Sequence, residues 1–233
     1  MPNYAMMAAM RRALVALAVL FWSGWALAQA NLAPGFTRLP PDARIALMPA
    51  DVELFEMGVG GLNEPKADWT EAATRHIMAD LRARKLRLGE RATEIAGEQD
   101  EAVEALNGLH GAVARAIVVH HFGPLKLPTK DGKLDWTLGP GAAKLREVSG
   151  ADYALFTWVR DSYASADRKA MMVVGALFGV GMAGGVQQAY ASLVDLRTGR
   201  IVWFNRIARG TGDLREPGPA AETLDALLAG FPL

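Results

Sequence analysis

The stretch Gln188–Arg209, with the sequence QAYASLVDLRTGRIVWFNRIAR, decides the fold that this chain can adopt. Both halves are rich in β-branched and aromatic residues, which favour strands. Between them, Asp195–Arg200 suits a type I turn that Gly199 closes in the left-handed conformation. The stretch therefore predicts an antiparallel hairpin of two strands, Gln188–Leu196 and Arg200–Arg209.

Four earlier segments predict the other strands of the sheet. Tyr153–Tyr163 has the same composition as the hairpin. Arg44–Met48 is a short apolar run, and Asp51–Met57 alternates apolar and acidic residues after Pro49. A strand that continues past a proline is typical of a sheet edge or a bulge. Leu86–Glu90 predicts a further short strand.

Helices are predicted between these strands. The first begins with Asp68 as N-cap, because Glu71 follows three residues later in a capping-box arrangement. Apolar residues at helical spacing predict three more helices, at Ala96–Phe122, Ala142–Val148 and Ala220–Leu228. The order of elements indicates an α+β domain with an α/β-like two-layer architecture: a small mixed β-sheet, flanking helices and a C-terminal antiparallel hairpin.

Residues 1–30 predict a secretory signal peptide. Arg11 and Arg12 precede the apolar run Ala13–Ala28, which ends in small residues that fit a cleavage site. The alternative is a permanent anchor helix, for which the apolar core is short. The prolines of residues 31–42 indicate an extended leader. Residues 43–233 then form a single α+β domain with an apolar, glycine-rich insertion at 170–186.

Charge and cysteine content exclude several classes of protein. Removing Arg11 and Arg12 with the signal peptide leaves 23 of the 25 basic residues against 25 acidic ones, a formal charge of −2. A nucleic-acid-binding protein would instead show a basic face, so no nucleic-acid partner is expected. The chain has no cysteine, which excludes disulfides, thiolate metal sites and the lipid anchor of a lipoprotein.

The residues that carry chemistry form no recognisable site. The four histidines, His76, His110, His120 and His121, lack the i, i+4 spacing of a helical zinc site. There is no G-x-S-x-G motif, and Ser192 and the other strand serines show no nearby histidine signal. No catalytic residue, metal ligand or cofactor is therefore predicted, and the protein is expected not to be an enzyme.

The insertion Ala170–Val186, AMMVVGALFGVGMAGGV, consists only of apolar residues and glycine. Three interpretations remain open: a connection packed on the domain's own sheet, a segment that touches a membrane or self-associates, and a transmembrane span. The strands predicted on both sides need one sheet, which disfavours the span. The candidate residues for interaction or membrane contact are Met171, Met172, Val174, Leu177, Phe178, Val180 and Met182.

Two motifs support a resemblance to a known family. They are Ser149–Phe156, SGADYALF, and Ser192–Trp203, SLVDLRTGRIVW. Together with the strand after the signal peptide and the capped helix, they resemble the amino-terminal domain of TolB, the curli-secretion lipoprotein and related cell-envelope proteins. The resemblance spans residues 42–209. It implies a small mixed sheet flanked by helices, an envelope location and a role in protein contacts or assembly.

We therefore expect an exported, non-enzymatic cell-envelope protein that acts in protein interaction or assembly at the periplasmic face of a membrane. Its partner would be an envelope protein or a second copy of the chain, with contact to a membrane as a further option. One alternative is a periplasmic ligand-binding or hydrolytic domain with a cleft near Gly58–Asn63 and the loop Gly123–Gly141. Another is an integral-membrane component that spans at 170–186.

Overall fold

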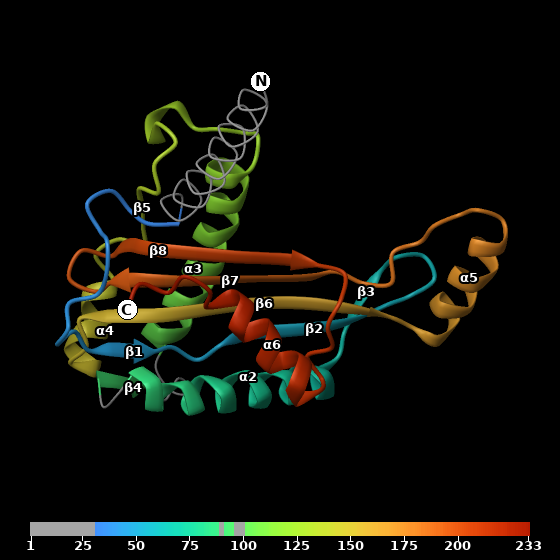
Figure 1. The fold of residues 1–233 in the computed structure, drawn as a ribbon, viewed down its shortest axis with the longest axis horizontal. Helices are drawn as coiled ribbons and strands as arrows, with labels where there is room; N and C mark the ends of the chain where they lie inside the picture. Colours follow the sequence, from blue (N-terminus) through green and yellow to red (C-terminus); the bar gives the residue numbers. More distant parts are fainter. Residues whose placement is uncertain (1–30, 89–90, 96–100) are drawn as a thin grey trace, which may run out of the picture.

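The computed structural model describes residues 31–88, 91–95 and 101–233. In these residues, eight strands form one mixed sheet with five flanking α-helices (Figure 1). The strands are β1 (Ile45–Leu47), β2 (Asp51–Met57), β3 (Asn63–Pro65), β4 (Ala92–Glu94), β5 (Trp136–Thr137), β6 (Tyr153–Ala164), β7 (Gln187–Asp195) and β8 (Arg200–Arg209). The helices are α2 (Ala67–Leu88), α3 (Glu101–Ile117), α4 (Ala142–Ser149), α5 (Ala166–Leu177) and α6 (Pro217–Leu227), with a π-helix at Val118–Phe122 and a 3-10 helix at Pro128–Lys130.

The strand order is β3-β2-β6-β7-β8-β5, and β6 is central to it. One side of β6 pairs in parallel with β1 and then with β2, while its other side pairs antiparallel with β7. Pro49 lies in the gap between β1 and β2, where its missing N–H leaves no ladder bond unmade. Only the three-residue strand β3 separates β2 from the sheet edge.

Helices cover both faces of the sheet, so the domain has three layers where two were expected. On one face, Ile77 of α2 and Leu224 of α6 share a core with Val159 of β6. On the other face, Ile117 of α3 packs in a second core with Phe156, and α4 joins the same core. In Figure 1, α3 passes behind the strands and α6 lies in front of them. The expected α+β class with a mixed sheet is confirmed.

The C-terminal hairpin is also confirmed, since β7 pairs antiparallel with β8. Gly199 closes its turn with φ 71°, and a Cβ there would lie 2.1 Å from the Gly139 carbonyl oxygen, so only glycine fits. The leader runs along the other edge of β8: Leu32 bridges Trp203, and the Ala33 amide donates to the Val202 carbonyl at 2.9 Å.

Two local predictions were wrong. The helix α2 begins at Ala67, so Asp68 lies in its first turn and is not the N-cap; there its carboxylate still faces the positive end of the helix dipole. The strand predicted at Leu86–Glu90 is not formed in the residues described, because the Arg, Lys and Leu residues before it favour helix and carry α2 on to Leu88. Residues 89–90 lie outside the described part. The short strand of this region is β4.

Candidate functional site

The apolar insertion forms an arm that projects from one end of the sheet. We use "the arm" for residues 166–186, which comprise α5 and the irregular segment that follows it. In Figure 1 the arm is orange and extends beyond the strand ends. Ser165 caps α5 by accepting a hydrogen bond from the Arg168 amide at 3.2 Å. Because the arm leaves β6 and returns as β7, the neighbouring strand, its two ends meet at the sheet.

Arg168 holds the two sides of the arm together. Its side chain is buried, although it has no acidic partner among the residues described. Nε and Nη2 donate to the Ala183 carbonyl at 3.0 and 2.9 Å. Nη1 donates to the carbonyls of Gly58 and Val59, in the loop between β2 and β3, at 3.2 and 3.3 Å. One guanidinium therefore joins both sides of the arm to the adjacent hairpin loop.

The returning side of the arm lies directly against the end of β6. The Ala164 amide donates to the Gly184 carbonyl at 2.7 Å, and the Val186 amide donates to Ser162 Oγ at 3.0 Å. Gly185, between these contacts, has φ 153°, and a Cβ there would lie 1.8 Å from the Ser162 carbonyl oxygen. A glycine is therefore required at this crossing.

Most of the predicted contact residues are exposed on the arm. Leu177 and Phe178, at the end of α5, are each 80% exposed. The other exposed members of the predicted set are Met171, Val174 and Val180. Large apolar side chains are seldom this exposed together on a monomeric soluble protein unless they form a contact surface.

Two of the predicted residues have a different role, and some exposed residues on or beside the arm were not predicted. Met172 and Met182 are half-buried, and their side-chain atoms lie near Gly184 and Gly175 respectively, between the two sides of the arm. Val173 on α5, and Val59 and Leu62 on the neighbouring β2–β3 loop, are exposed apolar residues. The sequence signal for Val173 was its place in the apolar run, whereas the β2–β3 loop is brought to the arm only by the fold.

The geometry bears on the three interpretations of the insertion. The exposed side chains of α5 rule out a connection packed on the domain's own sheet. In the described part of the chain, none of the helices has the length and apolar character needed to cross a membrane.

A buried polar network lies beneath the arm. The Asp161 carboxylate is 4% exposed and accepts hydrogen bonds from the Ser162 amide, Tyr163 Oη and Gln187 Nε2, at 2.8, 2.8 and 2.6 Å. Tyr163 Oη in turn accepts from the Leu214 amide at 2.7 Å. Burial raises the pKa of the Asp161 carboxyl, and these hydrogen bonds act in the opposite direction. The network fixes the ends of β6 and β7 from which the arm extends.

One pair of side chains has the elements of a catalytic dyad but lies in the core. His110 Nε2 is 2.8 Å from Ser192 Oγ, a proximity that the sequence did not indicate. Both side chains are fully enclosed, and the imidazole stacks on Phe156. Burial lowers the pKa of His110 to about 3, so the ring is neutral. Its burial also makes it inaccessible to a substrate. The pair therefore serves the packing of the second core.

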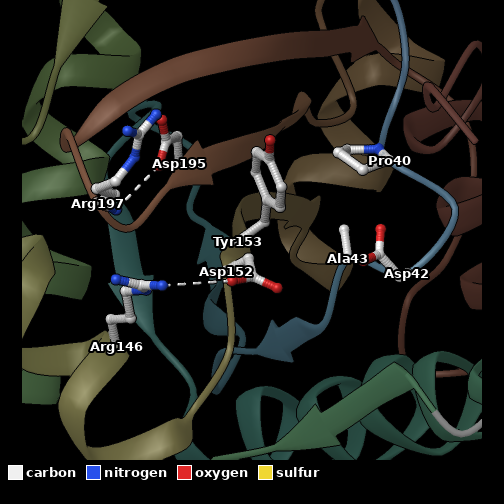
Figure 2. A pocket seen from close by; sticks show the side chains of 8 residues that line it. All are labelled: Pro40, Asp42, Ala43, Arg146, Asp152, Tyr153, Asp195 and Arg197. Carbon is white, nitrogen blue, oxygen red and sulfur yellow. Dashed lines mark hydrogen bonds and ion pairs between the residues drawn. The ribbon is translucent and has the colours of Figure 1, made fainter.

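Figure 2 shows a pocket at the end of the sheet opposite the arm. It measures about 260 Å³, and no histidine, serine or cysteine lines it. Its Asp152 carboxylate is 3.6 Å from Arg146, and its Asp195 carboxylate accepts from the Arg197 amide at 2.9 Å. These two acids are already engaged by the protein.

The alternative of a ligand-binding or hydrolytic domain named a cleft near Gly58–Asn63 and Gly123–Gly141, and the structure does not bring these two segments together. The first segment leads into β3 and the second contains β5, and these strands lie at opposite edges of the sheet. Within residues 31–88, 91–95 and 101–233, no three histidine, aspartate or glutamate side chains gather as a metal site requires. The arm is therefore the candidate site that the structure supports best.

Comparisons with known proteins give likenesses of fold. No protein-family model matches the chain, and no curated protein matches it either. The solved PelC dodecamer from Paraburkholderia phytofirmans is 14% identical, with a TM-score of 0.39, over 86% of this chain and 93% of that one. Lipoprotein GNA1162 from Neisseria meningitidis is 15% identical, with a TM-score of 0.29, over 72% of this chain and 79% of that one.

A third likeness is to the C-terminal domain of LpoB from Escherichia coli. The identity is 16% and the TM-score 0.27, over 76% of this chain and 87% of that one. At these identities and scores the likenesses concern the fold alone. None of the three structures is of TolB, so the resemblance to TolB remains a prediction. The function is argued below from the geometry of the arm.

Proposed function

We propose that this chain is an exported, non-enzymatic cell-envelope protein that uses the arm for protein interaction or assembly at the periplasmic face of a membrane. The observation that carries the proposal is the exposure of Leu177 and Phe178, each 80%, at the end of a helix that projects from the sheet. The predicted signal peptide supports export. The partner is an envelope protein or a second copy of the chain.

The physical case rests on how the arm is held. Burying one large apolar side chain contributes about 1.5–3 kcal/mol, so the exposed residues of α5 offer a substantial gain to a partner. Arg168 and Gly185 fix the arm in one position, which lowers the entropy lost on association. An arm held in this way is suited to contact with a partner.

Photo-crosslinking in cells tests the proposal. A photoreactive residue at Phe178 is expected to give a discrete product with an envelope protein or with a second copy. The same residue at Leu125, which is 63% exposed on a loop elsewhere, is the matched control and is expected to give none. Mass spectrometry of the product distinguishes the two kinds of partner.

A paired substitution supplies the second measurement. Leu177→Gln with Phe178→Gln is expected to remove the product, whereas Leu125→Gln with Val148→Gln leaves it unchanged. All four positions are exposed, so folding is expected to be unaffected. An unchanged product in the arm variant would refute the proposal. Carbonate extraction is expected to release the protein into the supernatant; retention in the membrane would favour the integral-membrane alternative.

A further inference from the structure

A second candidate site lies on the sheet face that α3 covers only in part. Four residues form one row across the strands: Asp51, Trp158, Tyr190 and Arg206 are successive register partners in β2, β6, β7 and β8. Side chains at such positions lie on the same face and in contact. The rings of Trp158 and Tyr190 stack with centroids 4.8 Å apart and planes within 5°.

Helix α3 brings a second arginine to this row. A Cβ on Gly111 would lie 2.9 Å from Trp158 Cδ1, so the helix backbone rests directly on the indole ring. Arg115 lies one turn further on the same helix face, and its guanidinium carbon is 5.8 Å from the centre of the Trp158 ring. Arg206 reaches from β8 over Phe122, at 4.6 Å. One guanidinium therefore reaches the Trp158–Tyr190 stack from α3, and the other comes from the β8 residue paired with Tyr190.

The donors at this place lack partners. Arg115 and Arg206 are exposed and have no acidic partner among the residues described. The Tyr190 side chain is 6% exposed, and its hydroxyl has no hydrogen-bond partner within the described part of the chain. Burial raises the pKa of Tyr190, and the positive charges of Arg115 and Arg206 act in the opposite direction.

The surrounding charges leave the site positive. Arg160 also lies over Trp158, but it pairs with Asp51 at 2.7 Å and with Glu53 at 3.1 Å. These two carboxylates face the same row, and Arg160 engages both. Arg115 and Arg206 are therefore left to interact with something else. Gln188 and Ala208, next to the row on the side of the arm, are exposed, so the site can be approached from solvent.

We propose that Arg115, Arg206 and the hydroxyl of Tyr190 bind a phosphate group on this face of the sheet. Guanidiniums have donors and no acceptor, and their planar forks match the oxygens of an oxyanion. The phenol supplies a third donor, and its ring is held in place by the stack with Trp158. The phosphate could be free or carried by a lipid headgroup, since both present the same oxygens. The site is separate from the arm, so its failure or success leaves the proposed function unaffected.

Titration of the purified protein with inorganic phosphate, followed by NMR of the arginine Nε–Hε groups, tests the proposal. Saturable shifts are expected for Arg115 and Arg206, with a Kd of about 1 mM, typical of a small exposed site. Arg115→Gln and Arg206→Gln are each expected to weaken binding roughly tenfold, the usual effect of one charged hydrogen bond. Tyr190→Phe keeps the ring stack and is expected to weaken binding by about threefold.

Arg197→Gln is the matched control, because it removes the same charge from an exposed arginine at the far end of the sheet. It is expected to leave phosphate binding unchanged. Absence of saturable shifts, or equal weakening in the control, would overturn the proposal. Vesicles of phosphatidylglycerol and phosphatidylcholine identify the source: headgroup binding predicts that Arg206→Gln releases the protein from both. If Arg206→Gln leaves the vesicle-bound fraction of the protein unchanged, and phosphate gives saturable shifts, the site binds a free phosphate.

Discussion

Arg168 and Ala183 are fifteen residues apart in the chain, and two hydrogen bonds from one guanidinium to one carbonyl join them, at 3.0 and 2.9 Å. The contact closes the arm at its base. Because the same guanidinium also reaches the β2–β3 loop, a single buried cation sets the direction in which an apolar surface leaves the sheet.

Replacing Arg168 by glutamine is expected to loosen the arm without unfolding the sheet. The substitution removes charged hydrogen bonds, each worth about 1.5–3 kcal/mol, so amide exchange in residues 166–186 is expected to rise at least tenfold. Hydrogen exchange with mass spectrometry measures this. Lys169→Gln, at the exposed neighbouring position, is the control and should leave exchange in the arm unaltered. Equal exchange in the two variants would show that Arg168 does not hold the arm.

Two glycines of the arm are expected to differ sharply on substitution by alanine. Gly185→Ala places a Cβ against the Ser162 carbonyl and is expected to cost about 2–3 kcal/mol of the free energy of unfolding. Gly181→Ala meets no atom within 4 Å and is expected to change it by less than about 0.5 kcal/mol. Urea denaturation measures both changes in the free energy of unfolding. Equal changes would contradict the close contact between Gly185 and the Ser162 carbonyl oxygen.

His110 is expected to make stability depend on pH in a defined window. Its pKa is lowered from 6.5 to about 3 in the folded state, so above pH 6.5 the His110 side chain is neutral in both the folded and the unfolded states. As the pH falls below 6.5, the unfolded chain binds a proton that the folded state excludes. The free energy of unfolding therefore decreases by about 1.4 kcal/mol per pH unit until the folded pKa is reached.

The comparison with His110→Gln isolates this contribution. Glutamine retains a hydrogen-bonding group near Ser192 and does not titrate, so its stability is expected to fall less between pH 6.5 and 4.5, as followed by urea denaturation. Asp161, whose pKa burial raises, acts in the opposite direction in both proteins and cancels in the difference. Parallel pH profiles for the two proteins would contradict a neutral, buried His110.

The hydroxyl of Tyr163 is expected to stabilise the base of the arm. Tyr163→Phe leaves both the Asp161 carboxylate and the Leu214 amide short of a partner, at a cost of about 1–3 kcal/mol. Tyr153→Phe is the control, because the hydroxyl of Tyr153 has no hydrogen-bond partner within the described residues, and its effect is expected to be below about 0.5 kcal/mol. Thermal unfolding followed by circular dichroism compares them, and similar losses would refute the role of Tyr163.

The sheet could be predicted because its signals are local. The hairpin carries its own turn, and the composition of Tyr153–Tyr163 is that of a strand whatever its neighbours are. The arm could be located but not oriented, because an apolar run has the same sequence whether it is buried or exposed. Its exposure follows from the pairing of β6 with β7, which brings its two ends together at one end of the sheet, so that the segment between them projects beyond the strands.

The supporting residues could not be predicted because their partners are distant in sequence. Arg168 binds carbonyls of the β2–β3 loop, more than a hundred residues earlier, and Tyr163 binds the amide of Leu214. His110 and Ser192 meet only when α3 crosses β7. Every residue has a backbone carbonyl, so a hydrogen bond from a side chain to a carbonyl requires no particular residue type at the acceptor position. Such a contact therefore cannot be recognised from the sequence.

The meeting of the arm's two ends has a consequence for evolution. A loop between strands that are already paired can change in length at a small entropic cost, which grows only with the logarithm of its length. The segment between Ala164 and Gln187 can therefore become longer or shorter, or change its side chains from apolar to polar, while β6 and β7 keep their register. Mutations confined to the connection between β6 and β7 could therefore give a related protein a new partner without changing the fold.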